Sequence, residues 1–68
     1  MFKIQCNKLF KGEGKKKAFV SNHPLSSKDH ASFTTNEKFA HVFTDMAICK
    51  NIRDDVLQVA DSVTILAI

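Results

Sequence analysis

Both glycines of the chain, Gly12 and Gly14, lie in one short segment between two stretches with an extended pattern, and this arrangement constrains the fold most. In residues 2–10 every even position except Lys8 carries an apolar side chain, which is typical of a strand with one buried face. Residues 16–21 resume an extended pattern. Glycine adopts the positive φ of a tight turn at little cost. The sequence therefore predicts an N-terminal β-hairpin with a loop of about four or five residues.

Pro24 ends the second predicted strand, because proline has no amide hydrogen to donate to a sheet and restricts the preceding residue to extended conformations. Residues 25–33 are rich in serine, charged residues and histidine. They are predicted to form a connector, in which Ser26 or Ser27 could cap a single helical turn.

A helix start is indicated at Thr34 to Glu37, which match a capping box: the threonine hydroxyl accepts from the third helical amide, and the glutamate reaches back to the threonine amide. Apolar residues then follow at the spacing i, i+3, i+4 and i+7, which places them on one face of a helix. They are Phe39, Val42, Phe43 and Met46. The pattern predicts a helix over about residues 35–49 that packs on the sheet through this face.

The last third of the chain fits two structures over residues 53–60. A second short helix would place Ile52 and Val56 on one face, whereas a tight hairpin would pair residues 56–59 with the last residues of the chain. Residues 63–67 are largely β-branched and apolar, and they are predicted to form a strand. Such a strand is either covered on both faces or exposed as an edge that pairs with another chain.

Together these segments predict one α+β domain over residues 1–68, in the order ββαβ or ββαββ, with the helix packed across the hairpin and the C-terminal strand completing the sheet. A chain of 68 residues has room for one hydrophobic core. It is also short for building, within a single copy, a ligand pocket of the usual ~300 Å³ or more.

Positive charge is concentrated at the N-terminal end of the chain. Residues 1–17 contain six lysines and one glutamate, a net charge of +5, whereas residues 18–68 contain four basic and six acidic side chains, a net charge of −2. Lysines neutralise phosphate groups, and glycine amides at a turn can approach an oxyanion closely. These features predict an anionic partner. The alternative is that the lysines only keep the edge of the hairpin soluble and unpaired.

The candidate partner-binding residues are the lysines of the predicted hairpin and one aromatic residue beside them: Lys8, Lys11, Lys15, Lys16, Lys17 and Phe19. On an extended strand Phe19 points away from Ala18 and Val20, so its ring could be exposed beside the lysines and stack on an unpaired base. The alternative is that Phe19 packs against Leu9 on the neighbouring strand. The chain contains one arginine, so any contact with nucleic acid is predicted to be largely independent of base sequence.

No motif predicts an enzyme, a cofactor or a metal site. The segment from Gly12 to Lys15 lacks the spacing of both common nucleotide-binding loops. The three histidines and two cysteines fall on separate predicted elements, without the close pairs of a zinc site. Cys6 and Cys49 are predicted to be reduced, partly buried thiols. The chain has no run of about 20 apolar residues and no signal-peptide pattern, which indicates a cytoplasmic protein that does not contact a membrane.

The sequence thus predicts a small, non-enzymatic accessory or regulatory binding protein whose lysine-rich hairpin contacts an anionic partner, either nucleic acid or an acidic protein surface. The alternative is a protein interaction or inhibitor module, with a homodimer as one form, that pairs through its C-terminal strand.

Overall fold

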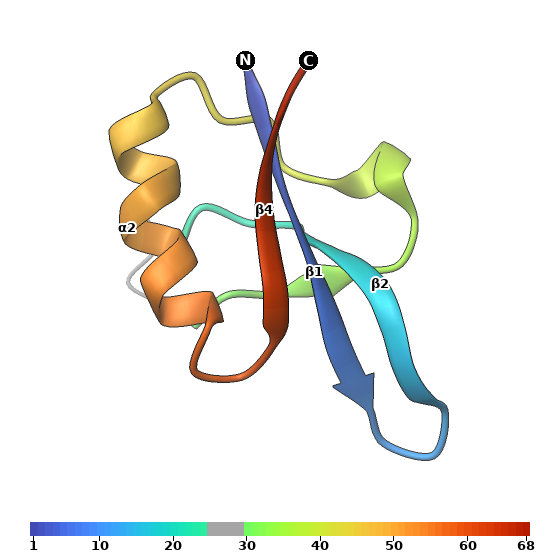
Figure 1. The fold of residues 1–68 in the computed structure, drawn as a ribbon. Helices are drawn as coiled ribbons and strands as arrows, with labels where there is room; N and C mark the ends of the chain where they lie inside the picture. Colours follow the sequence, from blue (N-terminus) through green and yellow to red (C-terminus); the bar gives the residue numbers. More distant parts are fainter. Residues whose placement is uncertain (25–29) are drawn as a thin grey trace.

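The computed structural model of the protein describes residues 1–24 and 30–68. Their elements, in chain order, are the strands β1 (Phe2–Phe10), β2 (Gly14–Val20) and β3 (Phe33–Thr34), the 3-10 helix η1 (Glu37–Phe39), the helix α2 (Met46–Val56) and the strand β4 (Asp61–Ala67). The strands form one antiparallel sheet in the order β3-β2-β1-β4 (Figure 1). This arrangement confirms the predicted α+β class. The predicted caps Ser26 and Ser27 lie outside the described residues.

The hairpin of β1 and β2 forms as predicted, with Phe10 opposite Gly14. Its loop contains only residues 11–13, so it is shorter than predicted. Gly12 and Gly14 both have a φ of 82°, in the left-handed region where other residues are strained. The amide of Glu13 donates to the carbonyl of Phe10 at 3.0 Å, which closes the turn. The two glycines are therefore required by the backbone of this turn.

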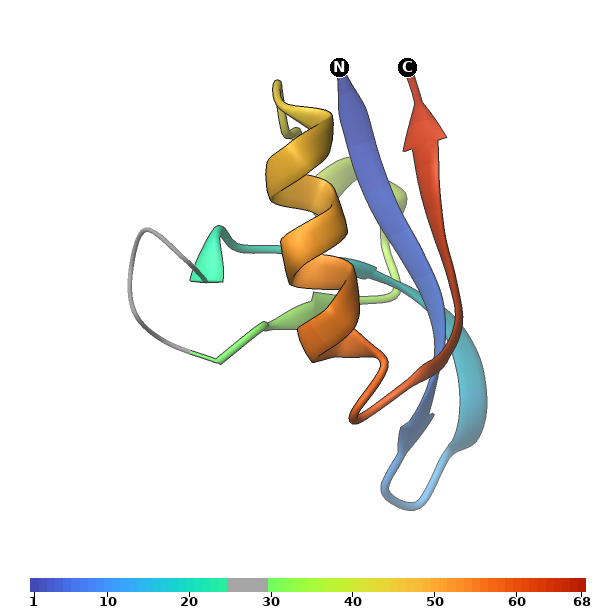
Figure 2. The ribbon, with the colours of Figure 1, turned by 60° about the vertical axis from the view of Figure 1, so that its left-hand side comes forward.

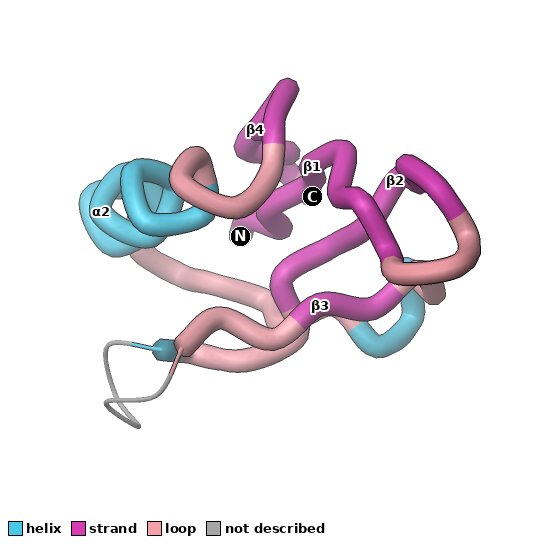
Figure 3. The backbone as a smooth tube through the Cα atoms, turned by 90° about the horizontal axis from the view of Figure 1, so that it is seen from below, coloured by secondary structure: helices cyan, strands magenta, loops and turns pink. Residues whose placement is uncertain are grey.

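The helix α2 covers one face of the sheet, which we call the inner face (Figure 2). Alternate side chains of β1 and β2 point to this face, as the apolar pattern predicts. The core joins the sheet to the helix and consists of Ile4, Cys6, Ala18, Val20, Phe43, Cys49, Ile52 and Val56. Seen from below, the strands follow an arc from β4 to β3, and α2 lies on the open side of this arc (Figure 3).

The pairing of β1 with β2 does not extend to the first residues of β1. The segment of residues 41–43 lies beside β1 there. The amide and carbonyl of Phe2 bond to the carbonyl and amide of Phe43, both at 2.8 Å. The amide of His41 donates to the carbonyl of Val20 at 3.0 Å, where β2 ends. Phe43 is thereby held between the two strands, and its ring enters the core with 2% of its surface exposed.

The prediction of one helix over residues 35–49 is wrong. The chain forms the short helix η1, then the extended segment that contains Phe43, and only then α2. The four residues of the predicted apolar face therefore do not share a face. Phe43 is buried, whereas Phe39, Val42 and Met46 are exposed, Phe39 with 69% of its surface. Backbone pairing with β1 and β2 outweighs the helical spacing of these side chains, since secondary-structure propensity is a weak preference.

The predicted capping box at Thr34 and Glu37 does not form. The hydroxyl of Thr34 accepts from the amide of Asn36 at 3.1 Å, and the side chain of Asn36 accepts from the amide of Lys38 at 3.0 Å. Such short-range bonds offer the backbone an alternative to a long helix. Glu37 instead approaches Lys3 of β1, with 3.7 Å between its carboxylate and the ammonium.

The helix α2 begins at an aspartate. The carboxylate of Asp45 accepts from the amide of Ala47 at 2.8 Å, which caps the first turn. The buried residues of α2 are Cys49, Ile52 and Val56, so the helical alternative for residues 53–56 is correct. The other alternative, a hairpin that pairs residues 56–59 with the chain's end, does not form, because the helix ends there in a turn that leads into β4.

The C-terminal strand is confirmed and begins two residues earlier than predicted, at Asp61. The register between β4 and β1 shifts between Gln5 and Asn7, where Ser62 and Val63 of β4 stand opposite a single residue of β1. Ser62 has a φ of 53°, as the extra residue of a β-bulge often does. Beyond the bulge, β4 pairs regularly with β1 and forms one edge of the sheet.

Among the described residues, no helix has both the length and the apolar character needed to cross a membrane.

Candidate anion-binding ribbon and adjoining cleft

The end of the hairpin projects beyond the rest of the sheet. The pairing of β1 with β4 ends at Asn7 and Asp61, and β3 pairs only with the last two residues of β2, whereas β1 and β2 stay paired up to Phe10 and Gly14. Residues 8–17 therefore form a two-stranded arm, which we call the ribbon (Figure 1). The alternating pattern and the glycine turn form the hairpin, and the ends of the pairing with β4 and β3 leave this part of it projecting.

Four of the five candidate lysines are exposed on the ribbon: Lys11, Lys15, Lys16 and Lys17. They do not share one face. Lys15 and Lys17 point to the outer face of the sheet, Lys16 points to the inner face, and Lys11 lies in the loop. The ribbon therefore carries positive charge on both sides.

Two of these lysines form ion pairs on the surface. The ammonium of Lys15 lies 2.5 Å from the carboxylate of Asp61, and that of Lys16 lies 2.9 Å from the carboxylate of Glu13. Exposed ion pairs of this kind contribute about 0–1 kcal/mol to stability. Either lysine can therefore leave its carboxylate partner and bind another anion. Within the described residues, Lys11 and Lys17 have no carboxylate partner.

Lys8 lies apart from the other four lysines. It is half-buried on the inner face, and its ammonium lies 5.2 Å from the ring centre of Phe33 and 5.7 Å from that of Phe10. Both distances allow a cation–π interaction. This contact explains the one charged residue in the apolar pattern of β1, because the ammonium rests on aromatic faces while the stem follows the sheet.

Phe19 is not available for stacking, so the expectation of an exposed ring is wrong. Only 2% of its surface is exposed. The register places Phe19 opposite Gln5 and Thr34, which also rules out the predicted contact with Leu9 across the strands. Phe19 points to the outer face, and η1 lies over this face, since Lys3 of the same face bonds to Glu37 of η1. The ring is thus buried on the face away from α2, outside the core that joins the sheet to the helix.

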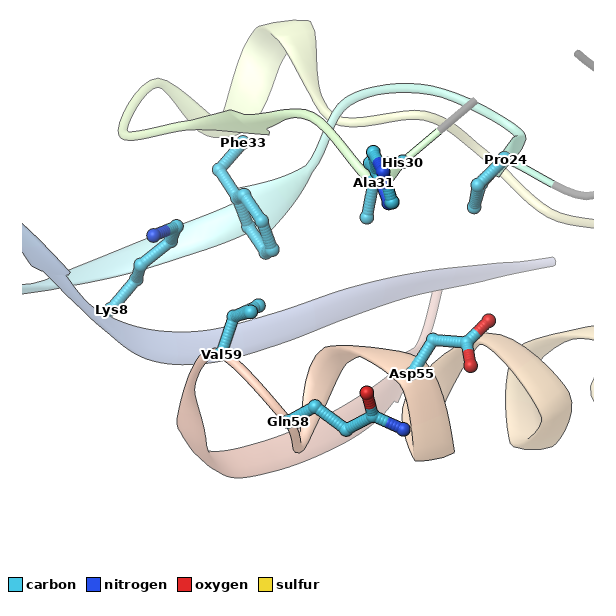
Figure 4. Close-up of a pocket in the computed structure, with 8 residues that line it drawn as sticks. All are labelled: Lys8, Pro24, His30, Ala31, Phe33, Asp55, Gln58 and Val59. Carbon is cyan, nitrogen blue, oxygen red and sulfur yellow. The ribbon is translucent and has the colours of Figure 1, made fainter. Parts of the chain in front are cut away.

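A cleft of about 550 Å³ opens on the inner face beside Lys8. It lies between the end of β1, the segment of residues 30–33, and the end of α2 with its following turn (Figure 4). Its lining residues are Lys8, Pro24, His30, Ala31, Phe33, Asp55, Gln58 and Val59. The expectation that the chain is too short for such a cavity is therefore wrong. Sequence patterns miss the cleft because its walls come from segments that are far apart in the chain.

The remaining titratable residues do not gather into a metal site. Within residues 1–24 and 30–68, no three histidine, cysteine, aspartate or glutamate side chains are close enough to hold a metal ion. The rings of His23 and His41 instead pack around Phe43, with ring centres 5.5 Å and 4.5 Å from it. Cys6 and Cys49 are free thiols, buried more deeply than predicted. Burial raises the pKa of both thiols, which keeps them protonated at neutral pH.

No protein-family model, no curated protein and no solved structure matches this chain.

Proposed function

We propose that this protein is a non-enzymatic accessory or regulatory binding protein that contacts an anionic macromolecule, either nucleic acid or an acidic protein surface, through the lysines of the ribbon. The observation that supports this proposal is the projection of four exposed lysines beyond the sheet, with Glu13 as the one acidic residue within the ribbon. A two-stranded β-ribbon is narrow enough to enter the major groove of DNA. Its charge on both sides also suits a partner that surrounds it.

Contact with nucleic acid through this ribbon should be independent of base sequence. The arginine that reads guanine in sequence-specific proteins is absent from the ribbon, because the one arginine of the chain, Arg53, lies on α2. The buried ring of Phe19 removes the stacking contact that would favour single strands. Attraction to backbone phosphates is then the main source of affinity, and it weakens as salt concentration rises.

The test compares two variants that lose the same charge. Lys11→Gln with Lys17→Gln removes the two ribbon lysines without a carboxylate partner, and Lys38→Gln with Lys50→Gln removes two exposed lysines on η1 and α2. Binding to a labelled mixed-sequence DNA duplex, a single strand and a polyglutamate peptide is measured by fluorescence anisotropy over a range of salt concentrations.

The ribbon variant should bind more weakly than the control variant. If four lysines each neutralise one phosphate of the duplex, the slope of log K against log salt is about −3.6, and it falls to about −1.8 in the ribbon variant. Binding to DNA alone would assign the partner to nucleic acid, and binding to polyglutamate alone would assign it to an acidic protein. Equal losses in the two variants, or no binding to any probe at low salt, would contradict the proposal.

The free edge of β4 favours a second candidate, pairing with a second copy of the chain. The amide of Ile68 donates to the carbonyl of Met1, and antiparallel ladders bond alternate residues, so the backbone groups of Ile65 and Ala67 face away from β1. Charged side chains usually protect such an edge from pairing with another chain. Residues 62–68 contain none. Two such edges can pair with each other around a two-fold axis.

This second candidate predicts a dimer that Ala67→Pro disrupts. Proline removes an amide that does not bond to β1, so it blocks the outer edge and leaves the sheet intact. Ala67→Val keeps the amide and serves as the control. Light scattering after size-exclusion chromatography should show a dimer for the natural chain and the control, and a monomer for the proline variant. A natural chain that remains monomeric at about 0.5 mM, far above the micromolar Kd of a specific dimer, would contradict this candidate.

A further inference from the structure

Lys8 brings an ammonium into the cleft, and within the described residues no carboxylate lies close enough to form an ion pair with it. Lys8 is half-buried, and its ammonium lies over the rings of Phe10 and Phe33 in cation–π geometry. An ammonium that rests on aromatic rings without a carboxylate partner gains from a carboxylate that approaches it, because charge-assisted hydrogen bonds are stronger than neutral ones. The cleft therefore contains a positive group that a small anion can satisfy.

The walls next to Lys8 are mostly apolar. Phe33 and Val59 lie beside it, and Ala31 and Pro24 continue this lining toward the other end of the cleft (Figure 4). The volume of about 550 Å³ is within the range of small-molecule pockets, which combine apolar walls with a few polar groups. This environment favours an aliphatic or aromatic tail attached to the anionic group.

Asp55 limits the number of negative charges that the cleft accepts. Its carboxylate lies at the end of the cleft away from Lys8, on the side opposite Pro24 (Figure 4). A ligand with a second anionic group at the end of its tail would bring that group toward Asp55 and be repelled. The arrangement favours a single anionic group bound at Lys8.

We propose that the cleft binds a small monocarboxylate with an apolar tail, with its carboxylate at the ammonium of Lys8 and its tail along Phe33 and Val59. This site uses Lys8 of the ribbon, whereas the function proposed above rests on the four exposed ribbon lysines and is tested at Lys11 and Lys17. Lys8 points to the inner face, whereas Lys17 points to the outer face and Lys11 lies in the loop. The variants that test the two proposals therefore change different faces of the hairpin, so failure of one proposal is distinguishable from failure of the other.

The first test uses three ligands with tails of the same length: hexanoate, hexanamide and adipate. Each is titrated at constant ionic strength into the ¹⁵N-labelled full chain, and amide shifts are followed by NMR. Hexanoate should shift the amides of Ala31, Phe33 and Val59 with a Kd on the order of 1 mM, as expected for a ligand of its size. Hexanamide should bind at least tenfold more weakly, because it lacks the charge, and adipate should bind severalfold more weakly. Equal affinities for hexanoate and hexanamide would overturn the proposal.

The second test removes the ammonium. Lys8→Met keeps an unbranched stem of similar length and lacks the charge, and Lys17→Met on the outer face is the matched control. The Lys8 variant should lose at least tenfold in affinity for hexanoate and keep the affinity of the natural chain for hexanamide, while the control variant keeps both. Unchanged hexanoate binding in the Lys8 variant would overturn the proposal. If this variant fails to fold, the comparison of hexanoate with hexanamide in the natural chain still decides.

Discussion

At the scale of single residues, Phe39 and Phe43 show how position in the fold outweighs side-chain type. They are identical residues four positions apart, yet 69% of the surface of Phe39 is exposed and only 2% of that of Phe43. The backbone of Phe43 is bonded to Phe2 through both its amide and its carbonyl, which fixes its ring in the core. Phe39 ends η1, where its amide donates to the carbonyl of Asn36 within the same turn and not to a strand.

We predict that Phe43→Ala lowers the free energy of unfolding by about 3–5 kcal/mol, because it leaves a cavity in the core. That loss is a large part of the roughly 5–15 kcal/mol that stabilises a typical domain. Phe39→Ala should change it by less than about 0.5 kcal/mol, as exposed substitutions usually do. Urea unfolding followed by circular dichroism measures both. Similar losses in the two variants would mean that the two rings share one buried face after all.

Lys8 shows what a local pattern can and cannot predict. The alternation of β1 identifies it as the charged residue on the apolar side of the strand, and the structure places it there. The pattern does not supply its partner, because Phe33 arrives from β3, which is separated from β1 by β2 in the sheet. Exposure of the other four ribbon lysines follows from sequence, whereas the burial of Phe19 depends on the assembled fold and has no local signal.

At the scale of elements, the hairpin and the C-terminal strand follow from sequence because their signals are local. The glycines set the turn, and the apolar run at the chain's end forms β4. The predicted position of the helix is wrong because residues 41–43 pair with the distant strands β1 and β2, and no local pattern reports that pairing. The sequence signal for the start of α2 is the N-cap Asp45, which is followed by apolar residues that face the core from one side of the helix.

We predict that Asp45→Ala destabilises the protein by about 1 kcal/mol, the usual cost of removing an N-cap. The sign of this change in stability distinguishes a helix that begins at Met46 from the predicted helix over residues 35–49. In a helix over residues 35–49, Asp45 would lie in the interior, where alanine is the better helix former and the change would stabilise.

The matched control is Asp54→Ala near the end of α2. It removes a negative charge close to the negative end of the helix dipole and should be neutral or slightly stabilising. Thermal unfolding of the two variants and the natural chain measures both effects. A stabilised Asp45 variant would contradict a helix that begins at Met46.

At the scale of the whole molecule, the strand order decides which surfaces are open. With β1 in the middle, β4 becomes an edge, and the ribbon extends beyond the strands that would otherwise cover it. The cleft also depends on this arrangement, since it joins β1, residues 30–33 and the end of α2. Sequence patterns predict the elements and the charge of the hairpin, but they contain little information on long-range pairing, so the cleft and the free edge emerge only from the assembled fold.

The most direct test of the central claim is an NMR map of the contact surface. A mixed-sequence DNA duplex and polyglutamate are each titrated into the ¹⁵N-labelled chain at low salt, and amide shifts are recorded along the sequence. We predict that the largest shifts fall on residues 11–17 of the ribbon and disappear when salt is added. Shifts that fall instead around Lys38, Lys50 or β4, or no shifts with either polymer, would contradict the assignment of function to the ribbon.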